Sequence, residues 1–139
     1  MESPEALAVL VYSNDQQTRD EVRLAVGSRP AADLPPVEFV EAVDGAGVLR
    51  EVDAGGIDLA ILDGEAWPTG GMGLCRQLKD ELDDCPPVLI LVGRRDDAWL
   101  ATWSRSDGTL SHPLDPIDVA ATVAKLLRGR VAGHPVRRA

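Results

Sequence analysis

Several apolar runs in this sequence end in polar residues that could form a binding or reactive site. Asp63 follows one run directly, Ser13, Asn14 and Asp15 follow another, and His112 follows the last. In a parallel α/β sheet the carboxyl ends of neighbouring strands meet at one edge, and ligands bind in the crevice there. A carboxylate at such a place is a candidate functional group, and a histidine beside it would change its charge near neutral pH. The sequence therefore predicts a polar pocket centred on Asp63.

Two further segments add candidates to this pocket. Glu65 lies in the glycine-rich loop after Asp63, and Val92 and Gly93 close the next apolar run. Arg94 and Arg95 follow Gly93 directly. They either stay solvated, as adjacent loop arginines usually do, or favour an anion or a polar small molecule at the pocket rim. The glycine-rich loop lacks the Lys-Ser/Thr pair of a phosphate-binding P-loop, so we expect a flexible connection there.

Some of these residues also have purely structural roles available. Asp15 suits the N-cap of a helix over residues 16–27, and capping is the role that we expect for it. Asn14 either caps the same helix or lines the pocket. His112 precedes a proline, which favours an extended backbone, and its imidazole either packs structurally or contacts a ligand.

The elements that must position these residues alternate regularly along the chain. Three apolar runs, one weaker run and a short last one have the lengths of buried strands: Leu7–Tyr12, Ile57–Leu62, Val88–Val92, Val37–Val43 and Thr109–Ser111. Amphipathic segments with helical spacing lie between and after them: 16–27, 45–54, 73–83, 96–105 and 116–128. This (βα)5 alternation predicts an α/β fold, a three-layer, doubly wound structure in which helices cover both faces of a five-stranded parallel sheet.

Composition and charge narrow the class of protein further. The 139 residues suit one domain over 1–128 with no output domain, followed by a basic, flexible tail over 129–139. The formal charge of −9 argues against direct contact with nucleic acid. Cys75 and Cys85 form no metal or disulfide pattern. There is no signal peptide and no apolar run of about 18 residues, so we expect a cytoplasmic protein without membrane insertion.

The segments Ile57–Asp63, Pro87–Leu91 and His112–Pro116 share features of one known family. Together they resemble the response-regulator receiver domain, a flavodoxin-like fold, over essentially residues 7–128. The first segment ends where family members carry the phospho-accepting aspartate, the second resembles their fourth strand, and the third looks like their Lys-Pro element. The resemblance implies a strand order of 2-1-3-4-5 and a role in two-component signal transduction.

Most of the reactive residues that the resemblance implies are replaced. The two positions that are usually acidic after the first strand hold Ser13 and Asn14, and the hydroxyl residue of the fourth strand is Val92. His112 stands where the family has lysine, and Thr109 stands at the aromatic switch position. Only the acceptor aspartate matches the family pattern.

These replacements weaken the chemistry that the family performs. Mg²⁺ takes carboxylate ligands, and Asp63, Asn14 and Asp15 are the candidates that remain, so we expect weak Mg²⁺ binding and no required cofactor. We favour a pseudo-receiver, which is a binding module and not an enzyme. One alternative is a phospho-accepting receiver that takes phosphate from a histidine kinase on Asp63. A flavodoxin-like small-molecule binder is a further alternative, disfavoured because no hydroxyl- and glycine-rich loop follows the first strand.

Tryptophans mark the predicted contact surface for other proteins. Trp99 and Trp103 lie four residues apart and so share a helix face; with Thr109 they form the predicted partner surface, although we expect at least one of them in the core. The resemblance implies partner contact through helix 4, strand 5 and helix 5, by a sensor kinase, a separate effector or a second copy in a homodimer. Trp67, in the glycine-rich loop, is either a packed lid or a contact residue.

Overall fold

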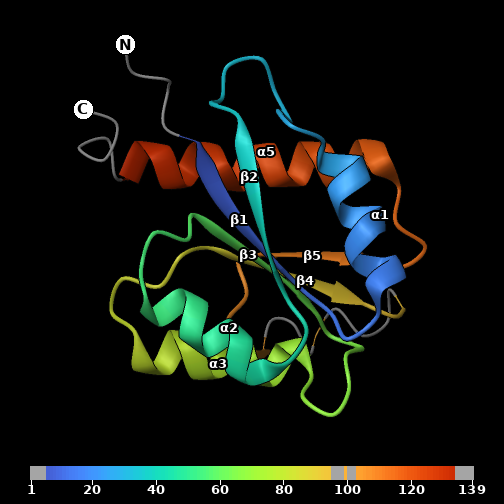
Figure 1. Ribbon diagram of the computed structural model, residues 1–139, viewed down its shortest axis with the longest axis vertical. Coiled ribbons are helices and arrows are strands. Elements are labelled where there is room, and N and C mark those ends of the chain that lie inside the picture. Colours follow the sequence, from blue (N-terminus) through green and yellow to red (C-terminus); the bar gives the residue numbers. More distant parts are fainter. Residues whose placement is uncertain (1–5, 95–98, 100–102, 134–139) are drawn as a thin grey trace.

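The computed structural model describes residues 6–94, 99 and 103–133, and within them five parallel strands form a single sheet (Figure 1). The strand order is β2-β1-β3-β4-β5, as the resemblance implied. The strands are β1 (Leu7–Tyr12), β2 (Val37–Ala42), β3 (Leu59–Asp63), β4 (Val88–Val92) and β5 (Gly108–Ser111). β3 lies at the centre, which places Asp63 between the ends of β1 and β4.

Helices cover both faces of this sheet, and the predicted three-layer α/β architecture is confirmed. The helices are α1 (Gln16–Val26), α2 (Gly45–Asp53), α3 (Gly71–Glu81) and α5 (Pro116–Gly133). α1 and α5 lie on one face, and α2 and α3 lie on the other (Figure 1). Most of the predicted helix over 96–105 lies outside the described residues, within which only Trp99 and the segment 103–105 fall.

Alternate side chains of each strand enter one of two apolar cores. In β1, Leu10 and Tyr12 pack toward α2 and α3, whereas Val9 and Val11 pack toward α1 and α5. β3 and β4 are buried at every position, which is why their sequences are apolar without alternation. The rigid centre of the sheet therefore holds Asp63 in a fixed place.

Local signals set the beginnings of the helices beside the site. The Asp15 side chain accepts a hydrogen bond from the Gln17 amide, so Asp15 is the predicted N-cap of α1. α3 begins at Gly71, two residues before the predicted start. A Cβ at Gly71 would lie 2.8 Å from the Asp63 carbonyl oxygen, so glycine allows this helix to start against the end of β3.

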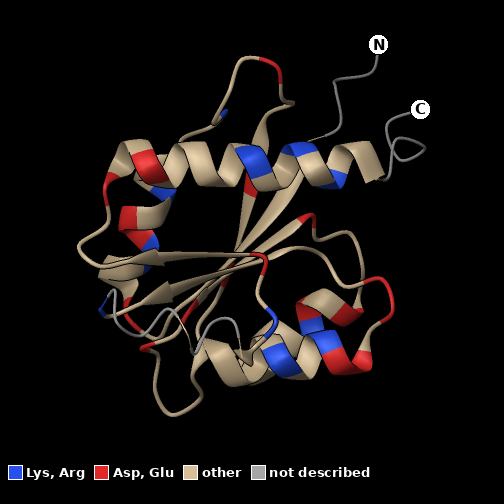
Figure 2. Ribbon diagram, turned by 180° about the vertical axis from the view of Figure 1, so that it is seen from behind, with Lys and Arg blue, Asp and Glu red and all other residues tan. Residues whose placement is uncertain are grey.

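The last helix is longer than predicted. α5 continues to Gly133, so the prediction of a flexible tail from residue 129 is wrong for residues 129–133, and residues 134–139 lie outside the described part. Arg130 explains the extension, because its side chain is 9% exposed and lies 3.8 Å from Asp58 and 3.6 Å from Asp84. An acidic residue in the first turn and basic residues toward the end suit the helix dipole (Figure 2).

Among the described residues, no helix combines the length and the apolar character that crossing a bilayer would need.

Cys75 and Cys85 are free thiols, and burial raises the pKa of the Cys75 thiol to about 11. Cys75 therefore packs as an apolar side chain on the buried face of α3.

Candidate functional site

Asp63 ends β3 with its carboxylate almost fully buried and both oxygens accepting hydrogen bonds. Oδ2 accepts from the Ser13 hydroxyl at 2.7 Å, and Oδ1 accepts from the Glu65 amide at 2.8 Å. The adjacent Gly64 amide donates to the Leu91 carbonyl at 2.7 Å, which ties the turn after β3 to β4. The protein itself therefore supplies partners to both oxygens of this carboxylate.

Ser13 is the residue that changes the character of the site. It is fully buried, and its Oγ accepts a hydrogen bond from the Asp15 amide at 3.0 Å while donating to Asp63. An acid at this position would place two carboxylates side by side, an arrangement that favours a cation or a shared proton. The Ser13 hydroxyl needs neither a cation nor a shared proton, because it donates its own proton in a hydrogen bond to the Asp63 carboxylate.

Arg19 holds the Ser13 segment in place, and sequence reasoning missed it. Its Nη1 donates to the Ser13 carbonyl at 2.6 Å, and its Nε pairs with Glu41 of β2 at 2.9 Å. Arg19 lies on the buried stripe of α1 beside Thr18 and Val22. An arginine within an apolar stripe was the available signal, since a buried cation requires partners.

Asn14 and Asp15 use their side chains for other bonds. The Oδ1 of Asn14 accepts from the Trp67 amide at 3.0 Å, so Asn14 joins the loop after β3 and does not cap α1. Asp15 caps α1 and also accepts from the Thr18 hydroxyl at 3.2 Å. Both residues are exposed.

The predicted set of Mg²⁺ ligands therefore fits the ion poorly. A cation at Asp63 would have to displace the hydrogen bond from Ser13, and Asp15 would have to leave its helix. Among residues 6–94, 99 and 103–133, no three His, Cys, Asp or Glu side chains form a group that could hold a metal ion.

Glu65, Gly93 and Val92 lie where β3 and β4 end. A Cβ on Gly93 would be 2.6 Å from Oε1 of Glu65, so the Glu65 side chain lies directly against Gly93. Val92 is fully buried among apolar residues of the core, where it extends the packing to the end of β4. The structure thus brings Glu65 and Gly93 together and gives Val92 a packing role.

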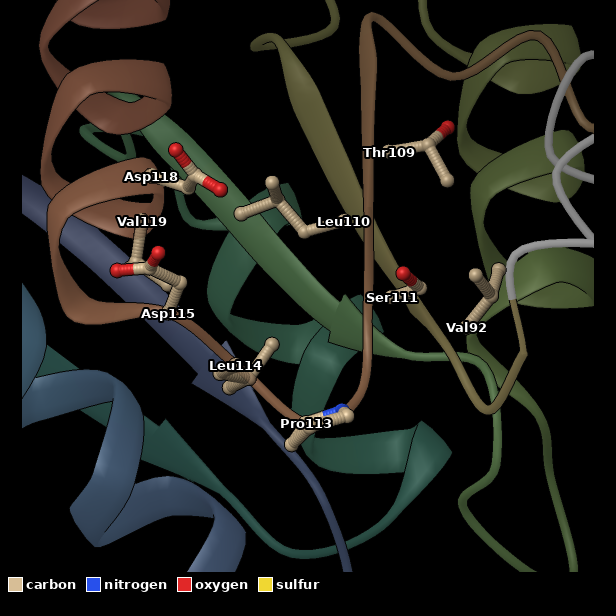
Figure 3. A pocket seen from close by; sticks show the side chains of 9 residues that line it. All are labelled: Val92, Thr109, Leu110, Ser111, Pro113, Leu114, Asp115, Asp118 and Val119. Carbon is tan, nitrogen blue, oxygen red and sulfur yellow. The ribbon is translucent and has the colours of Figure 1, made fainter.

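Val92 also lines a cavity of about 430 Å³ between β5 and α5 (Figure 3). Ser111 and Leu110 line it from β5, and Asp115 and Asp118 line it from the start of α5. Asp63 does not belong to this lining, so the cavity is separate from the site around Asp63. Thr109, predicted as a partner-surface residue, lies on β5 and lines this cavity.

His112 is attached to the sheet through its backbone. Its amide donates to the Val92 carbonyl at 2.9 Å, and the His112–Pro113 peptide bond is cis. Within the part of the chain that the structure describes, its half-buried imidazole makes no hydrogen bond or ion pair. His112 lies at the predicted strand end without a bond to the Asp63 carboxylate.

All three tryptophans are exposed. The exposed fractions are 76% for Trp67, 68% for Trp99 and 53% for Trp103, so the expectation that Trp99 or Trp103 lies in the core is wrong. Arg76 of α3 stacks on Trp103, with its guanidinium carbon 4.6 Å from the ring centroid, and donates to the Trp103 carbonyl at 2.9 Å. Arg76 of α3 thus fixes the position of Trp103, while part of the Trp103 ring remains exposed to solvent.

We expect Ser13→Ala to lower the free energy of unfolding by about 2 kcal/mol, because it leaves a buried carboxylate oxygen without its donor. Urea unfolding of the single variants and of Ser13→Ala with Asp63→Asn would measure the coupling between the two side chains. If the two changes are simply additive, the hydrogen bond does not stabilise the fold.

Comparison with known proteins agrees with this geometry. No family model matches the sequence. The chain is 57% identical over 127 residues to an uncharacterised response regulatory protein of Mycobacterium tuberculosis H37Rv, a match that covers 91% of this chain and 96% of the relative. The corresponding protein of strain CDC 1551 matches equally.

Solved receiver domains share the fold at low sequence identity. The receiver domain of Francisella response regulator 1452 has a TM-score of 0.74 at 19% identity, covering 88% of this chain and 98% of that chain. A CheY-like receiver domain protein from Methanospirillum hungatei has a TM-score of 0.72 at 14% identity, covering 93% and 99%. The 57% identity to the response regulatory proteins shows that the chain belongs to the response-regulator family. Its fold is that of the receiver domains, as the resemblance indicated.

Proposed function

We propose that this receiver domain signals by binding other proteins, with phosphorylation of Asp63 reduced or absent. It would act as a pseudo-receiver, and the proposed partners are a sensor kinase or a separate effector. The exposed Trp99 and Trp103, with β5 and α5, are the surface that we proposed from sequence for such contacts, and for a homodimer.

One observation carries this proposal, the hydrogen bond from Ser13 to Asp63. Phosphoryl transfer depends on positioned positive charge that neutralises the transferred group. Here the neutral Ser13 hydroxyl lies beside the Asp63 carboxylate. Asp15, the acid of the same segment, caps α1. The hydroxyl that would bind a phosphoryl oxygen is replaced by the methyl groups of Val92.

Phosphorylation of Asp63 is the second candidate function, and the position of the carboxylate favours it. Asp63 ends the central strand of the sheet, where the family carries its acceptor. A slow reaction with a phosphoryl donor would need Ser13 to release one oxygen of the carboxylate. The two candidates therefore differ in how tightly Mg²⁺ binds at Asp63.

Titration with Mg²⁺, followed by NMR of the backbone amides, tests this difference. At Mg²⁺ concentrations that saturate the Ser13→Asp variant, we expect little shift at the Glu65 and Asp15 amides of the unaltered protein, because their hydrogen bonds already satisfy Ser13 and Asp63. Ser13→Asp is the matched variant, in which a second carboxylate should produce a saturable shift. Saturation of the unaltered protein at the same Mg²⁺ concentrations, lost in Asp63→Asn, would overturn the proposal and favour the phospho-accepting receiver.

A further inference from the structure

The loop between β3 and α3, residues 64–70, is tied to the residues of the site at three points. The Glu65 amide donates to Asp63 at 2.8 Å, and the Trp67 amide donates to Asn14 at 3.0 Å. The third bond connects the end of β1 with the far end of the loop. Asp63 and Asn14, which accept the first two bonds, are both candidate pocket residues from the sequence.

The third bond runs from the Tyr12 hydroxyl to the Thr69 carbonyl at 2.5 Å. Burial raises the pKa of Tyr12, and the nearby carboxylates of Asp63 and Asp44 raise it further. The phenol therefore keeps its proton and remains a donor throughout the neutral range. Close packing fixes the end of the loop as well, since a Cβ at Gly71 would lie 2.8 Å from the Asp63 carbonyl.

The outer side of this loop carries Trp67, the most exposed tryptophan of the chain at 76%. Glu65 and Asp15 are exposed close by, since Glu65 is two residues away and Asp15 adjoins Asn14, which binds the Trp67 amide. Arg76 lies over the ring of Trp103. Within the described residues no such cation lies over Trp67.

We propose that the loop of residues 64–70 is a protein-docking surface, that its partner places an arginine over Trp67, and that its conformation is coupled to Asp63. This inference rests on the proposed function as a protein-binding module. Tryptophan is enriched among the residues that dominate interfaces, and its ring attracts a guanidinium group. The carboxylates of Glu65 and Asp15 would favour the same cationic partner.

The coupling follows from the capacity of the groups to form hydrogen bonds. The Asp63 carboxylate accepts from both Ser13 and Glu65. In Asp63→Ala, the side chain has no acceptor oxygen, so the bonds from Ser13 and from the Glu65 amide are both lost. The loop then loses one of its three ties, and the bond between Trp67 and Asn14 should open more often.

Amide hydrogen exchange measures this coupling in both directions. We expect Asp63→Ala to speed exchange at the Trp67 amide about fivefold, and Asn14→Ala to speed exchange at the Glu65 amide similarly, since coupling is reciprocal. Asp80→Asn, which alters a surface ion pair on α3, is the matched control and should change neither rate. Unchanged exchange at both reporter amides, in variants that retain the native circular dichroism, would overturn the coupling.

Docking is measured separately, with tetra-arginine peptide as the probe. In a Trp99→Phe, Trp103→Phe background, Trp67 is the remaining tryptophan and its fluorescence reports contact at the loop. We expect tetra-arginine to quench it saturably, tetra-glutamate not to, and Glu65→Gln to weaken the tetra-arginine effect several-fold. An equal response to both peptides would overturn the proposed partner chemistry. Phosphorylation of Asp63 would instead contradict the proposed function and leave the tetra-arginine result standing.

Discussion

A variant that carries Ser13→Asp, Val92→Thr and His112→Lys gains one phosphoryl group on Asp63 when it is incubated with Mg²⁺ and acetyl phosphate. Aspartate at position 13 would replace the Ser13 donor with a second carboxylate, which draws Mg²⁺ to the end of β3. Lysine supplies a positive charge and an ammonium donor at the end of β5. Removing one preorganised electrostatic donor typically costs about 10²–10³ in rate, so we expect restoring these groups to raise the rate of phosphorylation at least a hundredfold.

Intact-mass measurement checks this result, and the same triple variant with Asp63→Asn is the control that should gain nothing. Val92 is fully buried, so a threonine hydroxyl there carries a cost in stability. Ser13→Asp with His112→Lys, which keeps Val92, is a second variant for the case that the triple variant does not fold. If folded variants gain no phosphoryl group, the replaced residues are not what keeps Asp63 unreactive.

Arg130→Ala lowers the free energy of unfolding by about 3 kcal/mol, because it leaves a buried carboxylate without its cation. Asp58 is fully buried, and its Oδ2 accepts a hydrogen bond from the Ala8 amide at 2.9 Å while Oδ1 faces Arg130. This pair connects the start of β3, through Asp58, with the last turns of α5. Urea unfolding followed by circular dichroism measures the loss.

Arg128 gives a matched control one half-turn away on the same helix. It pairs with Asp33 at 2.8 Å, but both side chains are half exposed, so Arg128→Ala should change stability little. Equal effects of the two substitutions would contradict a structural role for the buried pair.

Apolar patterning was sufficient to predict the sheet, because fully buried strands carry continuous apolar runs. Leu7–Tyr12 and Val88–Val92 form β1 and β4 with the predicted bounds. The end of α5 was not predictable in this way, since residues 129–139 contain Gly, Pro and Arg and have no apolar core pattern. What continues the helix there is the long-range pairing of Arg130 with Asp58 and Asp84.

The residue types of the site were predictable, but most of their partners were not. Parallel pairing brings Ser13 and Asp63 together although they are 50 residues apart, and the sequence alone does not show which atom donates. The bond between Asn14 and Trp67 joins two loops whose approach depends on the whole sheet. Spacing placed Trp99 and Trp103 on one face but did not show that the face is exposed.

The most direct test of whether Asp63 accepts phosphate is the intact mass of the unaltered protein after incubation with Mg²⁺ and acetyl phosphate, beside the triple variant under identical conditions. We predict that the unaltered protein keeps its mass while the triple variant gains one phosphoryl group. A stable gain of one phosphoryl group by the unaltered protein, absent in Asp63→Asn, would contradict this prediction and establish a phospho-accepting receiver.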